Sequence, residues 1–142
     1  MNSDQTPFEL LGGDTGVHQL VDRFYDLMES APEAAHVRAL HATSLTQSRM
    51  KLHLFLTGWL GGPPLYVERY GHPRLRARHL PFVIGSMERD EWLWCMQRAL
   101  AEQSIPADVR HDLFEKLRGL ADHMRNQPDP DAPTHTMPII SG

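Results

Sequence analysis

The segment spanning residues 71–85 restricts the fold of this chain more than any other, because two prolines confine a cationic stretch within it. Pro73 suits the first turn of a helix, whereas Pro81 prevents that helix from continuing. The helix therefore has about two turns at most, and it is too short to be stable without packing on other elements. Leu75 and His79 are four residues apart, so they share one helix face. We expect His79 to point inward, with the neighbouring arginines at the edge.

The hydrophobic pattern of the remaining chain predicts helices and no strands. Apolar residues recur at three- and four-residue spacing, for example at Val17, Leu20, Val21 and Phe24, which is the period of an amphipathic helix. Capping residues, glycines and prolines separate the segments with this pattern. We expect longer helices between residues 14 and 32, 44 and 61, 86 and 100, and 106 and 124, and shorter ones at 7–11, 33–41 and 73–80. The predicted fold class is all-α.

Composition excludes several classes of protein. The net charge of −4 and the isoelectric point near 6.1 argue against general nucleic-acid binding, which favours basic domains. Cys95 is the only cysteine, so the chain has neither a disulfide framework nor the paired cysteines that attach c-type haem.

Length and tail composition predict one domain. The 142 residues suffice for a single core, and we place the domain at residues 1–126. The proline-rich residues 127–142 are expected to form a disordered tail. No apolar run approaches the roughly 20 residues of a membrane span, and the N-terminus lacks the features of a signal peptide. We therefore expect a soluble, cytoplasmic protein that does not bind membranes.

The usual catalytic motifs are absent from the sequence. There is no His-Glu-x-x-His motif, no cysteine pair, no Gly-x-Ser-x-Gly elbow and no glycine-rich phosphate loop. An inward His79 on a short helix then makes haem the natural cofactor, because haem iron needs only one protein ligand. Arg76, Arg78 and the Tyr66 hydroxyl are expected to bind the haem propionates at the rim.

Several strings of residues resemble one family. They are Gly12-Gly13 after a vestigial first helix, Phe24-Tyr25, Gly61-Gly62-Pro63 with Tyr66, the run from His72 to Phe82, and Glu88-Arg89-Asp90-x-Trp92. Between about Phe8 and Arg125 the chain resembles the truncated haemoglobins, and within them group II. The resemblance implies a truncated globin fold, a two-over-two helical sandwich around non-covalent haem b. It also implies that His79 is the proximal iron ligand.

The same resemblance assigns the ligand side of the pocket. Tyr25 and Trp92 match the ligand-stabilising pair of the family, and His41 falls where the family carries tyrosine, phenylalanine or histidine. His36 is the alternative to His41 if the loop alignment shifts. All three expected side chains can donate hydrogen bonds, His41 when protonated or in the suitable tautomer. Ser48 and Leu52 match positions near the ligand, Lys51 and Arg78 match propionate partners, and the expected haem-wall contacts are Phe55, Leu56, Phe82, Ile84 and Met96.

The leading functional hypothesis is reversible binding of dioxygen and related small ligands. Nitric oxide dioxygenation or peroxide reduction would need an external electron donor, and the protein could be a monomer or a homodimer. The alternative is a helical module that binds phosphate or nucleic acid through the basic cluster Arg69, Arg74, Arg76 and Arg78 with Tyr66 and Tyr70, although the acidic net charge opposes it. Tyr25 and Trp92 also have a simpler interpretation as packing residues. His18, His53 and His111 are interpreted as structural or solvent-facing, and Cys95 as a buried hydrophobic residue.

Overall fold

A computed structural model describes residues 5–129, and these residues form helices and connecting loops without strands. This confirms the predicted all-α class. The α-helices are α1 (Pro7–Leu10), α2 (Gly13–Ser30), α3 (Ala35–Ala39), α4 (Thr46–Trp59), α5 (Leu65–Tyr70), α6 (Leu75–His79), α7 (Ser86–Ala101) and α8 (Ala107–His123), and a 3₁₀ turn, η1 (Pro32–Ala34), precedes α3. None of these helices is both long enough and apolar enough to cross a bilayer. Most of the expected tail, residues 130–142, lies outside the described residues.

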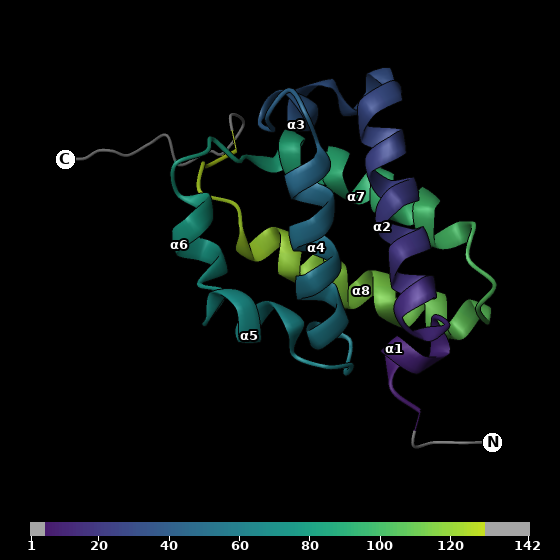
Figure 1. Cartoon of the computed structure of the whole chain (residues 1–142). Coiled ribbons are helices and arrows are strands. Elements are labelled where there is room, and N and C mark those ends of the chain that lie inside the picture. The colour runs from purple at the N-terminus through teal and green to yellow at the C-terminus, as the bar shows by residue number, and fades with distance from the viewer. Residues whose placement is uncertain (1–4, 130–142) are drawn as a thin grey trace.

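The four longest helices form two crossed pairs. In Figure 1, α2 and α4 lie side by side, and α7 and α8 run across behind them. Helix α2 packs against both α4 and α7, and α7 packs against α8. This arrangement is the predicted two-over-two sandwich. Its core contains the stripe of α2, including Leu20 and Phe24, together with Leu56 of α4 and Leu100 of α7, all almost fully buried.

Three helix boundaries differ from the sequence expectation. Helix α4 begins at Thr46 rather than at Ser44, and the Ser44 hydroxyl accepts a hydrogen bond from the Thr46 N–H. Helix α6 has only five residues, because Arg74 has a left-handed backbone with φ of 47° and Pro73 precedes the helix. Helix α7 is capped at Gly85, whose N–H donates to the Glu88 carboxylate over 2.9 Å. A side chain binds the backbone at the start of α4 and of α7, whereas the backbone conformation of Arg74 limits α6.

Helix α1 closes the end of the α4–α5 connection. The Phe8 N–H donates to the carbonyl of Leu60 over 2.9 Å. Gly61 has φ of 101°, a conformation that favours glycine. A Cβ on Gly62 would lie 2.8 Å from the Phe8 ring, which is too close for any side chain. The glycine pair therefore allows the backbone to turn closely beneath α1.

Candidate functional site

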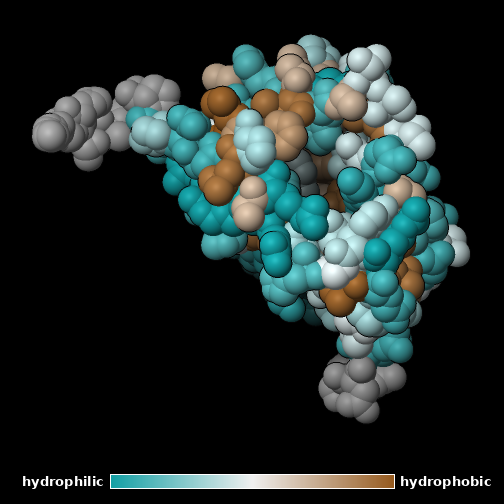
Figure 2. All heavy atoms as spheres, turned by 60° about the vertical axis from the view of Figure 1, so that its left-hand side comes forward, coloured by the Kyte–Doolittle hydropathy of each residue, from teal (hydrophilic) through white to brown (hydrophobic). Residues whose placement is uncertain are grey.

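A cavity of about 710 Å³ lies among the helices that carry the predicted site residues. Its volume falls in the range of roughly 300–1,000 Å³ typical of small-molecule and cofactor sites. Figure 2 turns the α5 and α6 side of the molecule forward and shows a hollow in this surface with apolar side chains beside it. The predicted site residues that line the cavity are Tyr25, His41, Ser48, Lys51, Leu52, Phe55, Tyr66, Arg78, His79, Phe82, Ile84 and Trp92.

Three predicted cofactor contacts do not line the cavity. Leu56 and Met96 are fully buried in the core between the helix pairs, because they face inward from α4 and α7 while Leu52, Phe55 and Trp92 face the cavity. Arg76 is not a rim residue either. Its Nη1 donates to the carbonyl of His123 over 2.6 Å and to the carbonyl of Arg125 over 2.9 Å.

Part of the cavity wall consists of residues that were not predicted from the sequence. Leu120 and Met124 near the end of α8 line it, as do Val37 and Leu40 around α3. Leu120 and Met124 have the i, i+4 spacing of one helix face, so the signal was present, but nothing in the sequence places the end of α8 next to α6. These apolar residues complete a wall suited to a flat hydrophobic ligand.

The imidazole of His79 has a defined tautomer. Its Nδ1 lies 2.6 Å from the carbonyl oxygen of Leu75. A carbonyl can only accept, so Nδ1 carries the proton and Nε2 keeps its lone pair. A hydrogen bond of this kind orients a metal-binding histidine and makes it more basic. The half-buried His79 ring is therefore prepared to bind a metal through Nε2.

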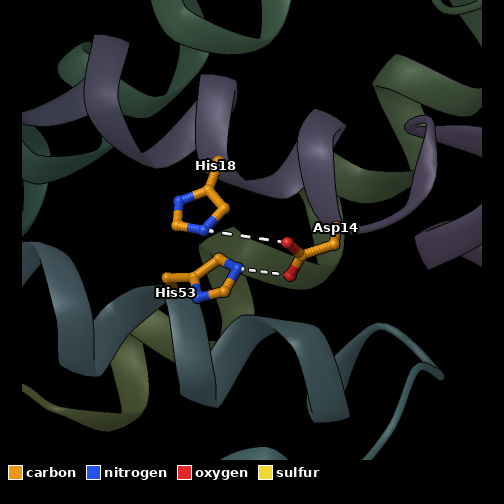
Figure 3. Close-up of side chains that lie close together, drawn as sticks. All are labelled: Asp14, His18 and His53. Atoms are coloured by element: carbon orange, nitrogen blue, oxygen red, sulfur yellow. Dashed lines mark hydrogen bonds and ion pairs between the residues drawn. The ribbon is translucent and has the colours of Figure 1, made fainter.

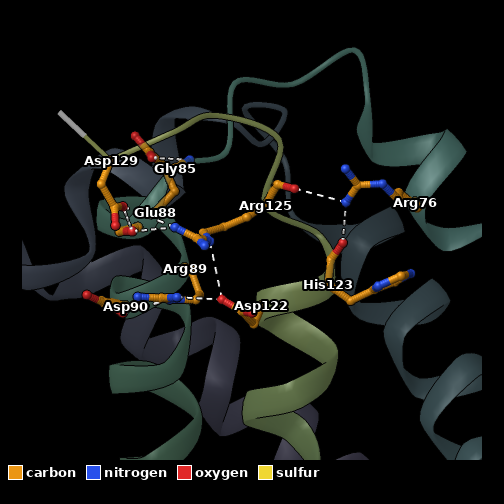
Figure 4. A network of polar contacts seen from close by, with 10 residues as sticks. Arg76, Gly85, Glu88, Arg89, Asp90, Asp122, His123, Arg125 and Asp129 are labelled. Atoms are coloured by element: carbon orange, nitrogen blue, oxygen red, sulfur yellow. Dashed lines mark hydrogen bonds and ion pairs between the residues drawn. The ribbon is translucent and has the colours of Figure 1, made fainter. Parts of the chain in front are cut away.

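The end of α8 holds the segment around His79. The side-chain amide of Asn126 donates to the carbonyls of His79, over 3.2 Å, and Phe82, over 2.8 Å, and its Oδ1 accepts from the Ile84 N–H over 3.0 Å. Figure 4 shows Arg76 reaching the backbone at His123 and Arg125, next to the ion pairs of Asp122. Contacts from residues 123–126, at the end of α8 and just after it, thus compensate for the shortness of α6.

Tyr25 and Trp92 are positioned by the core. Tyr25 is buried, and its ring meets Phe24 edge-on at 4.8 Å. Burial raises the pKa of the Tyr25 hydroxyl above its ordinary value, although Arg49 and a hydrogen bond with Ser48 oppose this shift. Tyr25 therefore stays protonated. The Trp92 ring also meets Phe24 edge-on, at 5.0 Å.

His41 lines the cavity, whereas the alternative His36 does not. His36 is exposed and pairs with Glu91 at 2.8 Å. The Nδ1 of His41 lies 2.9 Å from the carbonyl oxygen of Val37, so this nitrogen carries the proton. Burial lowers the pKa of His41, and the hydrogen bond to Val37 opposes that shift. The neutral ring therefore presents Nε2 as an acceptor, and only the protonated ring is the donor expected from the sequence.

Cations lie at the rim of the cavity. Lys51 and Arg78 both line it, and the Arg78 Nε donates to the carbonyl of Pro73 over 2.8 Å. Arg69 instead stacks on Tyr70, with 5.3 Å between its guanidinium carbon and the ring centre, and Arg76 binds the end of α8. The arginines of the basic cluster therefore have different roles, and only Arg78 among these three lines the cavity.

The residues present fit the haem implied by the sequence resemblance. Haem needs apolar walls, an axial nitrogen and cations for its two propionates. The cavity offers each of these through Phe82 and Ile84, through the Nε2 of His79, and through Lys51 and Arg78. The lone pair on the Nε2 of His79, left free by the hydrogen bond of Nδ1, is the main evidence that the cavity suits haem.

Comparisons with known proteins agree with this geometry. The profile of the bacterial-like globin family matches residues 6–126. The group 2 truncated hemoglobin YjbI of Bacillus subtilis is 42% identical over 125 residues, which cover 88% of this chain and 92% of that protein. The group II 2-on-2 hemoglobin of Agrobacterium tumefaciens is 47% identical, with a TM-score of 0.85 over 91% of this chain and 100% of that one.

A third relative comes from a cold environment. The cold-adapted truncated hemoglobin of the Antarctic bacterium Pseudoalteromonas haloplanktis is 41% identical, with a TM-score of 0.84 over 87% of this chain and 99% of that one. Sequence, fold and cavity lead to the same family. The chain therefore belongs to the bacterial-like globins, as a group II truncated haemoglobin whose cofactor is non-covalent haem b.

Proposed function

We propose that the cavity binds dioxygen and related small ligands reversibly opposite His79, and that Tyr25 and Trp92 retain the ligand by donating hydrogen bonds. When bound, the haem supplies the iron at which such ligands bind and electrons are exchanged. The observation that carries the proposal is that α2, α6 and α7 bring Tyr25, His79 and Trp92 to one cavity.

The role of His79 follows from its tautomer. Its Nε2 holds the haem, while the Nδ1–H bond to the Leu75 carbonyl fixes the plane of the ring. The carbonyl of His79 is held in turn by the Asn126 amide. Both ends of this residue are therefore restrained, which suits a permanent axial ligand.

Tyr25 and Trp92 act as donors of different kinds. The raised pKa of Tyr25 keeps its hydroxyl protonated, and this hydroxyl can donate to a ligand that carries partial negative charge. The indole N–H of Trp92 can only donate, and the Trp92 side chain lines the cavity. Preorganised donors of this type stabilise developing negative charge without reorganisation.

His41 serves as a proton acceptor on the side of the cavity where the ligand binds. The His41 and Tyr25 rings meet edge-on, with 5.9 Å between their centres. As a neutral base, His41 can accept and return a proton beside the ligand, while Tyr25 stays protonated and donates a hydrogen bond. For this reason we also propose that the same site, supplied by an external electron donor, catalyses nitric oxide dioxygenation or peroxide reduction.

The test of the proposal is optical. The purified protein, reduced with dithionite and then freed of it, should show a Soret band that shifts when oxygen is admitted and returns under argon over repeated cycles. Immediate oxidation without a stable oxygenated spectrum would contradict reversible binding. The His79→Ala variant should lack the parent spectrum, and a variant with an unchanged spectrum would contradict the role of His79.

A further inference from the structure

A second cluster of metal-ligating side chains lies outside the cavity, where α2 packs against α4. Figure 3 shows Asp14 and His18 of α2 and His53 of α4 pointing toward one another. One ligand atom from each residue lies within 4.8 Å of the others. None of the three lines the haem cavity, so the cluster is separate from the site described above.

The carboxylate of Asp14 joins the two imidazoles. The Nε2 of His53 lies 2.8 Å from one Asp14 oxygen, and the Nε2 of His18 lies 3.8 Å from the other. The two rings stack, with 3.7 Å between their centres and 15° between their planes. Both histidines therefore direct the same nitrogen to the same acidic group.

Burial divides the cluster into a fixed part and an accessible part. The side chain of His53 is 9% exposed, whereas those of His18 and Asp14 are 55% and 61% exposed. The buried ring is held in place by the contact between helices, and the two exposed groups remain reachable from solvent. A metal ion can enter from the exposed side.

The geometry points to a site for a divalent transition-metal ion of the zinc type, and we propose that Asp14, His18 and His53 are its protein ligands. Two imidazoles and one carboxylate are a common ligand set for zinc, with a further position open to water. Bonds of about 2.0–2.1 Å place tetrahedral ligand atoms about 3.3 Å apart. The Nε2 of His53 is 2.8 Å from one Asp14 oxygen and the Nε2 of His18 is 3.8 Å from the other, and these two separations lie on either side of that value.

The helical spacing supports this assignment. Asp14 and His18 are four residues apart on α2 and so occupy one face, as do the paired ligands of helical zinc motifs. The two rings are stacked, so the in-plane lone pairs of their nitrogens do not point at one position, and the exposed His18 side chain must rotate to direct its Nε2 at the same ion as His53. A bound cation would replace the protons between the nitrogens and the carboxylate and release them to solvent.

Metal binding would connect α2 to α4. Helix α4 also carries Lys51, Leu52 and Phe55, which line the haem cavity, whereas His53 faces α2. An ion that binds only the folded protein raises the stability of the fold with increasing metal concentration. The proposed site therefore restrains a wall of the cavity without contacting the haem.

The experiment is a zinc titration of the full chain in its haem-loaded form, after treatment with a chelator. We expect calorimetry to give one zinc ion per chain with a Kd below about 100 µM, and zinc to raise the thermal midpoint. The variants His18→Ala and Asp14→Asn change exposed side chains and should fold. Each should weaken zinc binding by about tenfold or more and abolish the thermal shift.

The matched control is His111→Ala, which removes an exposed histidine from α8 and should keep both the affinity and the shift. A Kd of 100 µM or above in the parent protein would overturn the proposal. So would an affinity or a thermal shift that either variant leaves intact. In those cases the contact between His53 and Asp14 is only a hydrogen bond between helices.

Discussion

The side-chain amide of Asn126 donates a hydrogen bond of 3.2 Å to the carbonyl oxygen of His79, 47 residues earlier in the chain. The same side chain binds the backbone at Phe82 and Ile84. Helix α6 has only five residues and cannot hold its own shape. The orientation of His79 therefore depends on the segment that follows α8.

Replacement of Asn126 should loosen the haem. Asn126→Ala removes three hydrogen bonds, so we expect a loss of about 2–3 kcal/mol in unfolding free energy and faster transfer of haem to an acceptor globin. Asn126→Asp should be no better, because a carboxylate cannot donate to the His79 and Phe82 carbonyls. Gln47→Ala, which removes an exposed amide of α4 away from Asn126, is the control. Unchanged stability and unchanged haem transfer in Asn126→Ala would show that these three hydrogen bonds are dispensable.

Replacement of the two arginines of α6 should affect haem retention and stability differently. Arg78 lines the cavity, whereas Arg76 binds the carbonyls of His123 and Arg125. Arg78→Gln should speed haem loss several-fold at low salt and less at high salt, since screening weakens an exposed ion pair. Arg76→Gln should lower stability by about 1 kcal/mol. A stronger salt-dependent haem loss in Arg76→Gln than in Arg78→Gln would reverse their assignment.

The release of dioxygen should depend on pH through His41. Burial places the pKa of this ring below the ordinary histidine value, which is about 6.5. Above about pH 6.5 the ring is neutral and its Nε2 accepts a hydrogen bond. As the pH falls through the lowered pKa, the ring becomes protonated and donates a hydrogen bond to the ligand. The release of dioxygen should then slow. Stopped-flow measurements should show this change, and His41→Leu should remove it while His36→Leu keeps it. A titration that persists in His41→Leu would place its origin elsewhere.

His41 also affects stability, and the sign follows from its lowered pKa. Between the two pKa values the unfolded chain binds more protons than the folded chain, so stability rises with pH. The contribution of His41 is fully present above about pH 6.5 and declines as the pH falls toward the folded pKa. Urea unfolding should therefore show that the parent loses stability relative to His41→Leu as the pH falls, and a difference that stays constant with pH would contradict this sign.

Some features were predictable because they depend on local spacing. Helical periodicity and proline or glycine stops predicted the helices, and the four-residue separation predicted that Leu75 and His79 share a face; both line the cavity. Leu56 and Met96 lie in the core and do not line the cavity. Adjacent helix positions differ by about 100°, and an apolar side chain suits either the core or a haem wall. The spacing of Leu56 and Met96 in the sequence does not indicate whether they face the core or the haem.

Other features depend on tertiary contacts that no local pattern reveals. The carbonyl groups bound by Arg76 and Asn126 belong to segments more than 40 residues away in sequence. The approach of His53 to Asp14, 39 residues earlier, likewise exists only because α2 and α4 pack together.

The dioxygen dissociation rate of Trp92→Phe tests the central claim most directly. Phenylalanine keeps an aromatic ring for the contact with Phe24 but lacks the N–H donor, so the hydrogen bond to the ligand is lost. A hydrogen bond to a charged group contributes about 1.5–3 kcal/mol, so release should accelerate at least tenfold, while Trp94→Phe, on the same helix but outside the cavity, leaves it unchanged. A dissociation rate in Trp92→Phe equal to that of the parent would contradict the claim that Trp92 holds the ligand.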